Sequence, residues 1–90
     1  MKLEWDDVKQ QRNLRKHGLD FARCEEVLLG PNYTYADERD YDEPRSITIG
    51  ILDGNLVVVV STERGDATRI ISMRPANKQE NSKYGKEIFG

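Results

Sequence analysis

The sequence predicts an α+β fold with two N-terminal helices, an antiparallel sheet of about four strands and a C-terminal helix. Residues 56–60 are a continuous apolar run rich in β-branched side chains, which is typical of a strand covered on both faces. Residues 45–52 alternate between isoleucine and small or polar residues, which indicates a neighbouring strand. A third strand is expected over residues 68–74, after a polar connection over residues 62–68 that contains Gly65 and Asp66.

The first helix is delimited by residues that commonly begin and end helices. Asp6 or Asp7 can cap a helix that runs to about His17, and Gly18 is placed to end it. This helix has few apolar residues, so it is expected either to be mostly solvated or to line a site. A stripe with a four-residue spacing runs along it and contains Trp5, Lys9, Asn13 and His17.

A second helix is expected over residues 21–29, with Asp20 as its cap. Its apolar face consists of Phe21, Cys24, Val27 and Leu28. Cys24 is most simply a small core residue. Because only Gly18 and Leu19 connect the two helices, we expect them to form a helical hairpin.

The remaining elements are shorter. Residues 3–5 and 33–35 are expected to form short strands, and the charged run 37–43 a loop. Residues 53–55 are a strong turn signal between two strands. The last 14 residues or so leave room for one helix containing Glu80 and Tyr84, with Pro75 near its start.

Regular alternation assigns side chains of the strand 68–74 to two faces. Ile71 and Met73 are predicted to share one face, and Arg74 lies on the other. Arg69 is then predicted to point away from Arg74. One face of the sheet is expected to pack on the helices and the other to be left open.

Composition limits the possible classes of protein. Ninety residues are consistent with one domain, and 33% of them are charged. No apolar segment has the length of a transmembrane helix or resembles a signal peptide, so a cytoplasmic protein is expected. The net charge of −2 argues against nonspecific coating of nucleic acid. The charge is uneven, because residues 30–55 carry six acidic and two basic groups, while residues 56–90 carry four acidic and six basic groups.

A set of short matches, in order along the chain, resembles a known family. They are Trp5-Asp6 with Lys9 and Asn13, Lys16-His17-Gly18 with Phe21, Thr62-Glu63-Arg64, Arg69-Ile70-Ile71-Ser72 with Arg74 and Ala76, and finally Glu80 and Tyr84. In these positions the chain resembles the BrnT toxins of type II toxin–antitoxin pairs, which have a RelE-like ribonuclease fold. The resemblance covers nearly the whole chain and implies a single toxin domain over residues 1–90.

The resemblance also implies an activity and partners. It implies a metal-independent endoribonuclease, without a cofactor, that cleaves RNA and inhibits translation. It further implies a ribbon-helix-helix (BrnA-like) antitoxin that neutralises the toxin in a hetero-oligomer, with DNA bound only through the antitoxin. The family tends to have an acidic residue directly before the arginine that opens the sheet strand. Here Pro44 separates Glu43 from Arg45 and is expected to displace the carboxylate.

Metal-free RNA cleavage needs a base for the 2′-hydroxyl, positive charge for the transition state and an acid for the leaving oxygen. His17 is the only histidine, and imidazole is suited to proton transfer near neutral pH, although it can also interact with the last carbonyl groups of its helix. Arg64 and Arg74 are the leading candidates for charge stabilisation, with surface ion pairs as the alternative. No cluster of histidines and carboxylates has metal-ligand spacing, so no metal site is predicted.

The other candidates also have two readings each. Lys9 can neutralise phosphate or be solvated, and Asn13 can orient a substrate hydroxyl or be solvated. Glu80 can act as a base, or can cap its helix or pair with Lys83. Tyr84 can stack on an RNA base or anchor the last helix, and Arg69 can bind RNA or serve a structural or antitoxin-facing role. The alternative for the whole chain is a non-catalytic partner-binding subunit or corepressor of a DNA-binding antitoxin.

Overall fold

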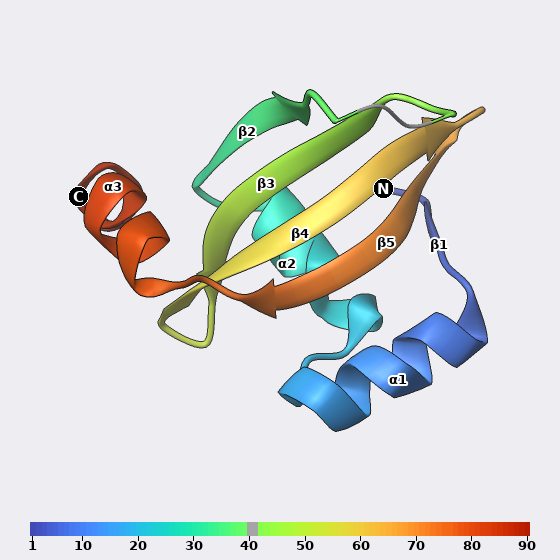
Figure 1. Ribbon diagram of the computed structural model, residues 1–90, viewed down its shortest axis with the longest axis horizontal. Coiled ribbons are helices and arrows are strands. Elements are labelled where there is room, and N and C mark those ends of the chain that lie inside the picture. The colour runs from blue at the N-terminus through green and yellow to red at the C-terminus, as the bar shows by residue number, and fades with distance from the viewer. Residues whose placement is uncertain (40–41) are drawn as a thin grey trace.

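The computed structural model describes residues 1–39 and 42–90, which form a five-stranded sheet and three α-helices (Figure 1). The strands are β1 (Leu3–Glu4), β2 (Asn32–Asp37), β3 (Arg45–Leu52), β4 (Asn55–Arg64) and β5 (Ala67–Pro75). The helices are α1 (Asp7–His17), the 3-10 helix η1 (Phe21–Arg23), α2 (Cys24–Leu29) and α3 (Lys78–Phe89). The α+β class is therefore confirmed.

The sheet order is β1-β5-β4-β3-β2, and the last four strands pair antiparallel. The predicted turn after β3 is confirmed and has two residues, Asp53 and Gly54, with φ of 52° and 79°. Positive φ at both positions matches the right-handed twist of a hairpin, and Asp-Gly is a favoured pair for it. The next turn is shorter than predicted, because β4 extends to Arg64 and β5 begins at Ala67.

Two details of the predicted fold differ from the structure. The short strand expected over residues 3–5 is present as β1, but it joins β5 in parallel at Leu3↔Thr68 and Glu4↔Arg69, so the sheet has five strands rather than about four and is not wholly antiparallel. The second predicted helix begins as a 3-10 turn, η1, before α2. The parallel pairing has no local sequence signal, because the partner of β1 lies some 65 positions away.

A β-bulge in β5 corrects the predicted faces of that strand. Ser72 pairs with Val60 and Ile70 with Ser61, so Ile71 is the extra residue. The inserted residue reverses the alternation on one side of the bulge. Ile70 and Met73 consequently share one buried cluster, while Arg69 and Arg74 lie together on the opposite face of the sheet.

Each face of the sheet has its own core. On the face that contacts α2, called here the α2 face, the buried cluster comprises Phe21, Cys24, Val27, Leu52, Val57, Val59, Ile70 and Met73. On the opposite face, the α3 face, Ile49, Leu56, Val58 and Ile88 are buried. The α3 face is therefore not left open as expected, because α3 covers part of it. The predicted apolar face of the second helix and the core position of Cys24 are confirmed.

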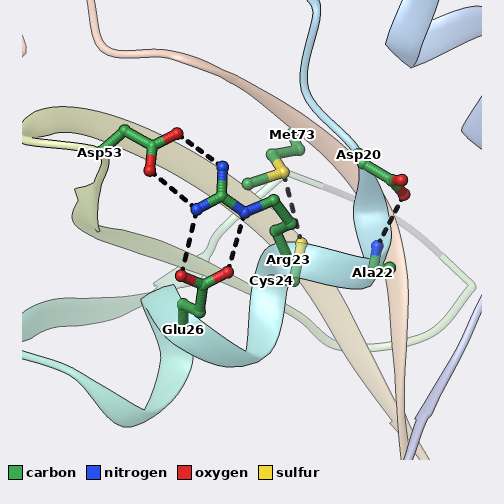
Figure 2. Close-up of polar contacts among 7 residues, drawn as sticks. All are labelled: Asp20, Ala22, Arg23, Cys24, Glu26, Asp53 and Met73. Atoms are coloured by element: carbon green, nitrogen blue, oxygen red, sulfur yellow. Dashed lines mark hydrogen bonds and ion pairs between the residues drawn. The ribbon is translucent and has the colours of Figure 1, made fainter.

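An ion-pair network fixes η1 and α2 to the β3–β4 turn (Figure 2). The Arg23 guanidinium donates hydrogen bonds to both Asp53 carboxylate oxygens and to both oxygens of Glu26. These contacts hold the pKa of Asp53 and Glu26 below their usual values. Beneath them, the Cys24 thiol lies 3.6 Å from the Met73 sulfur, and burial raises its pKa to about 12.

The predicted helical hairpin is wrong. Helix α1 ends at Gly18, with φ of 69°, and its main contacts are with β5 and η1. Figure 1 shows α1 beside the β5 edge of the sheet, while α2 crosses the sheet on one face. Helix α1 has no buried residue. Polar contacts and Trp5, whose ring packs edge-on against Phe21, therefore hold this part of the chain to the rest.

Candidate functional site

A groove of about 370 Å³ runs between α1 and the edge of β5. The residues lining it are Lys9, Arg12, Asn13, Lys16, His17, Phe21, Ile71, Ser72, Met73 and Arg74. Four of these carry a fixed positive charge, one is a histidine and none is a carboxylate. The groove is therefore lined by positive charges together with apolar side chains from η1 and β5.

Helix geometry explains why so many cations reach the groove. Asp6 caps α1 by accepting hydrogen bonds from the backbone N–H groups of Val8 and Lys9. Residues three, four and seven positions apart then share one face of the helix. The lining residues Lys9, Arg12, Asn13 and Lys16 have this spacing.

Asn13 holds α1 against the open edge of β5. Its amide nitrogen donates to the Leu19 carbonyl oxygen at 3.1 Å, and its amide oxygen accepts from the Met73 backbone N–H at 3.3 Å. An edge strand presents unpaired backbone groups, and this side chain satisfies one of them. The geometry thus gives Asn13 a structural task between two segments that are 60 positions apart.

Arg74 lines the groove and is bound to Glu80. The guanidinium donates hydrogen bonds of 2.7 and 2.9 Å to the two Glu80 oxygens. Glu80 also accepts from the Asn77 backbone N–H, which completes a capping box at the start of α3. These hydrogen bonds, donated by Arg74 and accepted by Glu80, lower the pKa of Glu80 and raise the pKa of Arg74. Glu80 therefore combines a helix-capping contact with an ion pair to Arg74, rather than to Lys83.

The structure brings together some of the predicted site residues and separates others. Lys9, Asn13, His17 and Arg74 line the groove, and Glu80 contacts Arg74. Arg64 does not line it, because it lies six residues further along β4 than Val58, the partner of Arg74, which corresponds to roughly 20 Å. Arg69 lies on the α3 face, 3.8 Å from the Glu4 carboxylate.

Tyr84 lies on the same side of the sheet. It packs against the core of the α3 face and contacts the rings of Tyr33 and Tyr35 on β2. This is the anchoring geometry considered for Tyr84 from the sequence. It also creates an aromatic cluster that the sequence did not predict.

Two groove residues, Arg12 and Lys16, were missed as site candidates. The signal for them was present, since they lie three and seven positions after Lys9. The predicted stripe contained only residues spaced four apart, so it did not include Arg12 and Lys16. The strand residues opposite them, Ile71 and Ser72, had no comparable signal because the bulge decides their placement.

The expected displacement of Glu43 by Pro44 is wrong. Arg45 Nη2 lies 3.3 Å from the Glu43 carboxylate, so the pair forms across the proline. The Pro44 carbonyl oxygen accepts a hydrogen bond from the Thr62 hydroxyl at 2.6 Å, which secures this segment on β4.

Comparison with known protein families decides the identity. The family model for the ribonuclease toxin BrnT of type II toxin–antitoxin systems matches residues 5–80. The chain belongs to the BrnT family. No curated protein matches the chain.

The BrnT match includes α1, the whole of β5 and Glu80, so every groove-lining residue lies within it. Tyr84 lies beyond its end. Within residues 1–39 and 42–90, no three histidine, cysteine or acidic side chains gather as a possible metal site. None of the described helices has the length and apolar character needed to span a membrane.

Proposed function

We propose that this BrnT-family chain cleaves single-stranded RNA bound in the groove between α1 and β5. The observation that carries the proposal is the gathering of Lys9, Arg12, Lys16, His17 and Arg74 around one groove with no carboxylate in its lining. Such a surface suits a phosphodiester backbone, since each phosphate carries a negative charge. The chain's net charge is −2, so the cations must be concentrated locally to act on RNA.

The proposed reaction is attack of the ribose 2′-oxygen on the adjacent phosphorus. The O2′–P bond forms and the P–O5′ bond breaks, while the 2′-hydroxyl loses a proton and the leaving 5′-oxygen gains one. His17 is the proposed proton-transfer group because it is the only imidazole in the chain and lies in the groove. Arg74 is proposed to stabilise the charge that develops on the phosphoryl oxygens.

Glu80 is proposed as a positioning residue rather than a base. Its pKa is lowered chiefly by the hydrogen bond from Arg74, and a carboxylate with a lowered pKa is a weak proton acceptor at neutral pH. Both of its oxygens bind Arg74. Glu80 is thereby proposed to fix the orientation of the Arg74 guanidinium beside the groove.

Arg64 and Arg69 are proposed as contacts to RNA outside the reacting centre. By strand alternation both share the α3 face with Arg74. Arg64 is exposed at the β4–β5 turn, whereas Arg69 is partly neutralised by Glu4. Contacts at this distance affect affinity rather than the chemical step.

The wider biology follows from family membership and is likewise proposed. Cleavage would proceed without a metal ion and would inhibit translation in the cytoplasm. A ribbon-helix-helix antitoxin would neutralise the toxin in a hetero-oligomer and would supply the contacts to DNA.

The test is cleavage of a long single-stranded RNA by the purified protein in the presence of EDTA. We expect wild type to cleave, His17→Ala to lose about 10²–10⁴-fold in rate and Arg74→Ala about 10²–10³-fold. Arg64→Ala should mainly weaken binding. Arg15→Ala is the matched control, because Arg15 is an exposed α1 residue that does not line the groove.

Equal cleavage rates for wild type and His17→Ala would show that His17 takes no part in the chemical step. Cleavage that EDTA abolishes would contradict the metal-free mechanism. If folded wild-type protein binds RNA without cleaving it, the alternative of a non-catalytic partner-binding subunit would replace the nuclease.

A further inference from the structure

Three tyrosine rings form a cluster on the α3 face near the β2 edge of the sheet, whereas the groove lies along β5 toward the other edge. The centroid of the Tyr84 ring lies 5.1 Å from that of Tyr33 and 6.4 Å from that of Tyr35. The Tyr35 and Tyr84 planes are within 15° of parallel, and Tyr33 and Tyr35 are 6.0 Å apart. Such offset arrangements are favourable for aromatic side chains.

The three rings are not equally buried. Tyr35 and Tyr84 are half-buried and pack against the apolar cluster of Ile49 and Val58. Tyr33 remains 46% exposed at the edge strand of the sheet. Anchoring α3 explains the two inner rings, but it leaves a large aromatic surface at Tyr33 in contact with solvent.

The cluster is connected to the groove through the register of the sheet. Arg74 pairs with Val58, Val58 with Ile49 and Ile49 with Tyr33, so Arg74 and Tyr33 lie in one cross-strand row. Three inter-strand spacings separate their backbones by roughly 14 Å. A few nucleotides of a single strand can span this distance.

The middle of this row, Val58 and Ile49, is buried in the core that α3 covers, so a bound strand would follow the neighbouring row, which is more accessible. The next row across the sheet consists of Ser72, Val60, Ile47 and Tyr35, all half-buried. Lys83 adds a positive charge beside the tyrosines, with its ammonium 5.3 Å from the Tyr84 ring centroid. Cations next to exposed aromatic rings are the pattern by which proteins bind single strands, through phosphates and through stacked bases respectively.

We propose that Tyr33, backed by Tyr35 and Tyr84, is a stacking subsite for an unpaired nucleobase of the RNA that the groove holds. The subsite rests on the RNA binding proposed above and adds a substrate class, namely strands with an unpaired base a few nucleotides from the phosphate at Arg74. Duplex RNA is disfavoured there, because its bases are already stacked within the helix.

The experiment measures the affinity of the full chain for two 2′-O-methyl RNA strands, which cannot be cleaved because the attacking hydroxyl is blocked. One strand has all its bases, and the other has abasic sugars in place of several of them. The variants are Tyr33→Leu, which removes the ring, Tyr33→Phe, which keeps it, and Arg12→Gln, which removes a groove cation. Thermal unfolding of each variant verifies that it is folded.

We expect Tyr33→Leu to weaken binding of the base-containing strand about tenfold and to leave binding of the abasic strand unchanged. Tyr33→Phe should bind like wild type, and Arg12→Gln should weaken binding of both strands. If Tyr33→Leu binds the base-containing strand like wild type while Arg12→Gln binds it more weakly, the stacking subsite is overturned, but RNA binding in the groove is supported. An equal loss for both strands would also overturn stacking. If wild type binds neither strand, the proposed function fails and the subsite with it.

Discussion

The Arg74 guanidinium and the Glu80 carboxylate form a two-point ion pair, with N–O distances of 2.7 and 2.9 Å. The pair joins the end of β5 to the first turn of α3 and simultaneously determines the direction of Arg74 at the groove. Side-chain exposure is 42% for Arg74 and 15% for Glu80, so the carboxylate is the more sheltered partner. One contact thus contributes both to helix attachment and to the orientation of a proposed functional cation.

Glu80→Gln should destabilise the protein by about 1–2 kcal/mol at pH 7, because it removes a charge-assisted pair and weakens the capping box. The folded-state pKa of Glu80 lies below its ordinary value of 4.5. Its contribution is therefore present above that value and is lost as the pH falls through the folded-state pKa. Urea unfolding at several pH values should show the difference between wild type and Glu80→Gln shrinking below about pH 4.5. A difference that stays constant down to pH 2 would contradict this account.

Arg12→Gln and Lys16→Gln should each weaken RNA binding and lower the slope of log affinity against log salt by about 1. Each variant removes one cation from the groove lining and with it one phosphate contact. Fluorescence anisotropy titrations with single-stranded RNA at several salt concentrations would measure this slope. Arg15→Gln has the same charge change on the same helix, outside the groove lining, and its slope should match that of wild type.

Asn13→Ala should lower stability by about 1–2 kcal/mol, because the Leu19 carbonyl and the Met73 N–H lose their partner. Thermal and urea unfolding would measure the loss, with Gln11→Ala as the control at an exposed position of α1. RNA binding should be unaffected at temperatures where the variant is folded. Weaker RNA binding without a loss of stability would instead support direct recognition by Asn13.

Gly50→Ala and Gly85→Ala should have opposite effects on stability. A Cβ at Gly50 would lie 2.8 Å from Val27 Cγ1 and 3.1 Å from the Val27 carbonyl oxygen, so we expect a loss of about 1–3 kcal/mol. A Cβ at Gly85 meets nothing within 4 Å, and alanine is the better helix former by about 0.5–1 kcal/mol. Comparison of the two denaturation midpoints tests the close packing of α2 on β3. A neutral Gly50→Ala variant would mean that α2 can move away from the sheet.

The elements that could be predicted from the sequence are those determined by neighbouring residues. The caps of α1 at Asp6 and Gly18 depend on contacts within one helical turn, and the turn at Asp53 and Gly54 depends on backbone preferences. Membership of the BrnT family could likewise be predicted from the sequence, because the resemblance depends on short matches in order along the chain. Lys9 and His17 were correctly expected to share a line on α1.

Tertiary structure alone decided which side chains meet across long separations. The bulge at Ile71 reversed the alternation of β5 and brought Arg69 to the same face as Arg74, since one unpaired residue shifts every side chain beyond it. Packing of α1 on the β5 edge, rather than on α2, joined the cations of α1 to Arg74 and left Arg64 far away. Local sequence determines the face of a helix or strand on which a residue lies, whereas the contacts of that face depend on sheet register and on how the elements pack.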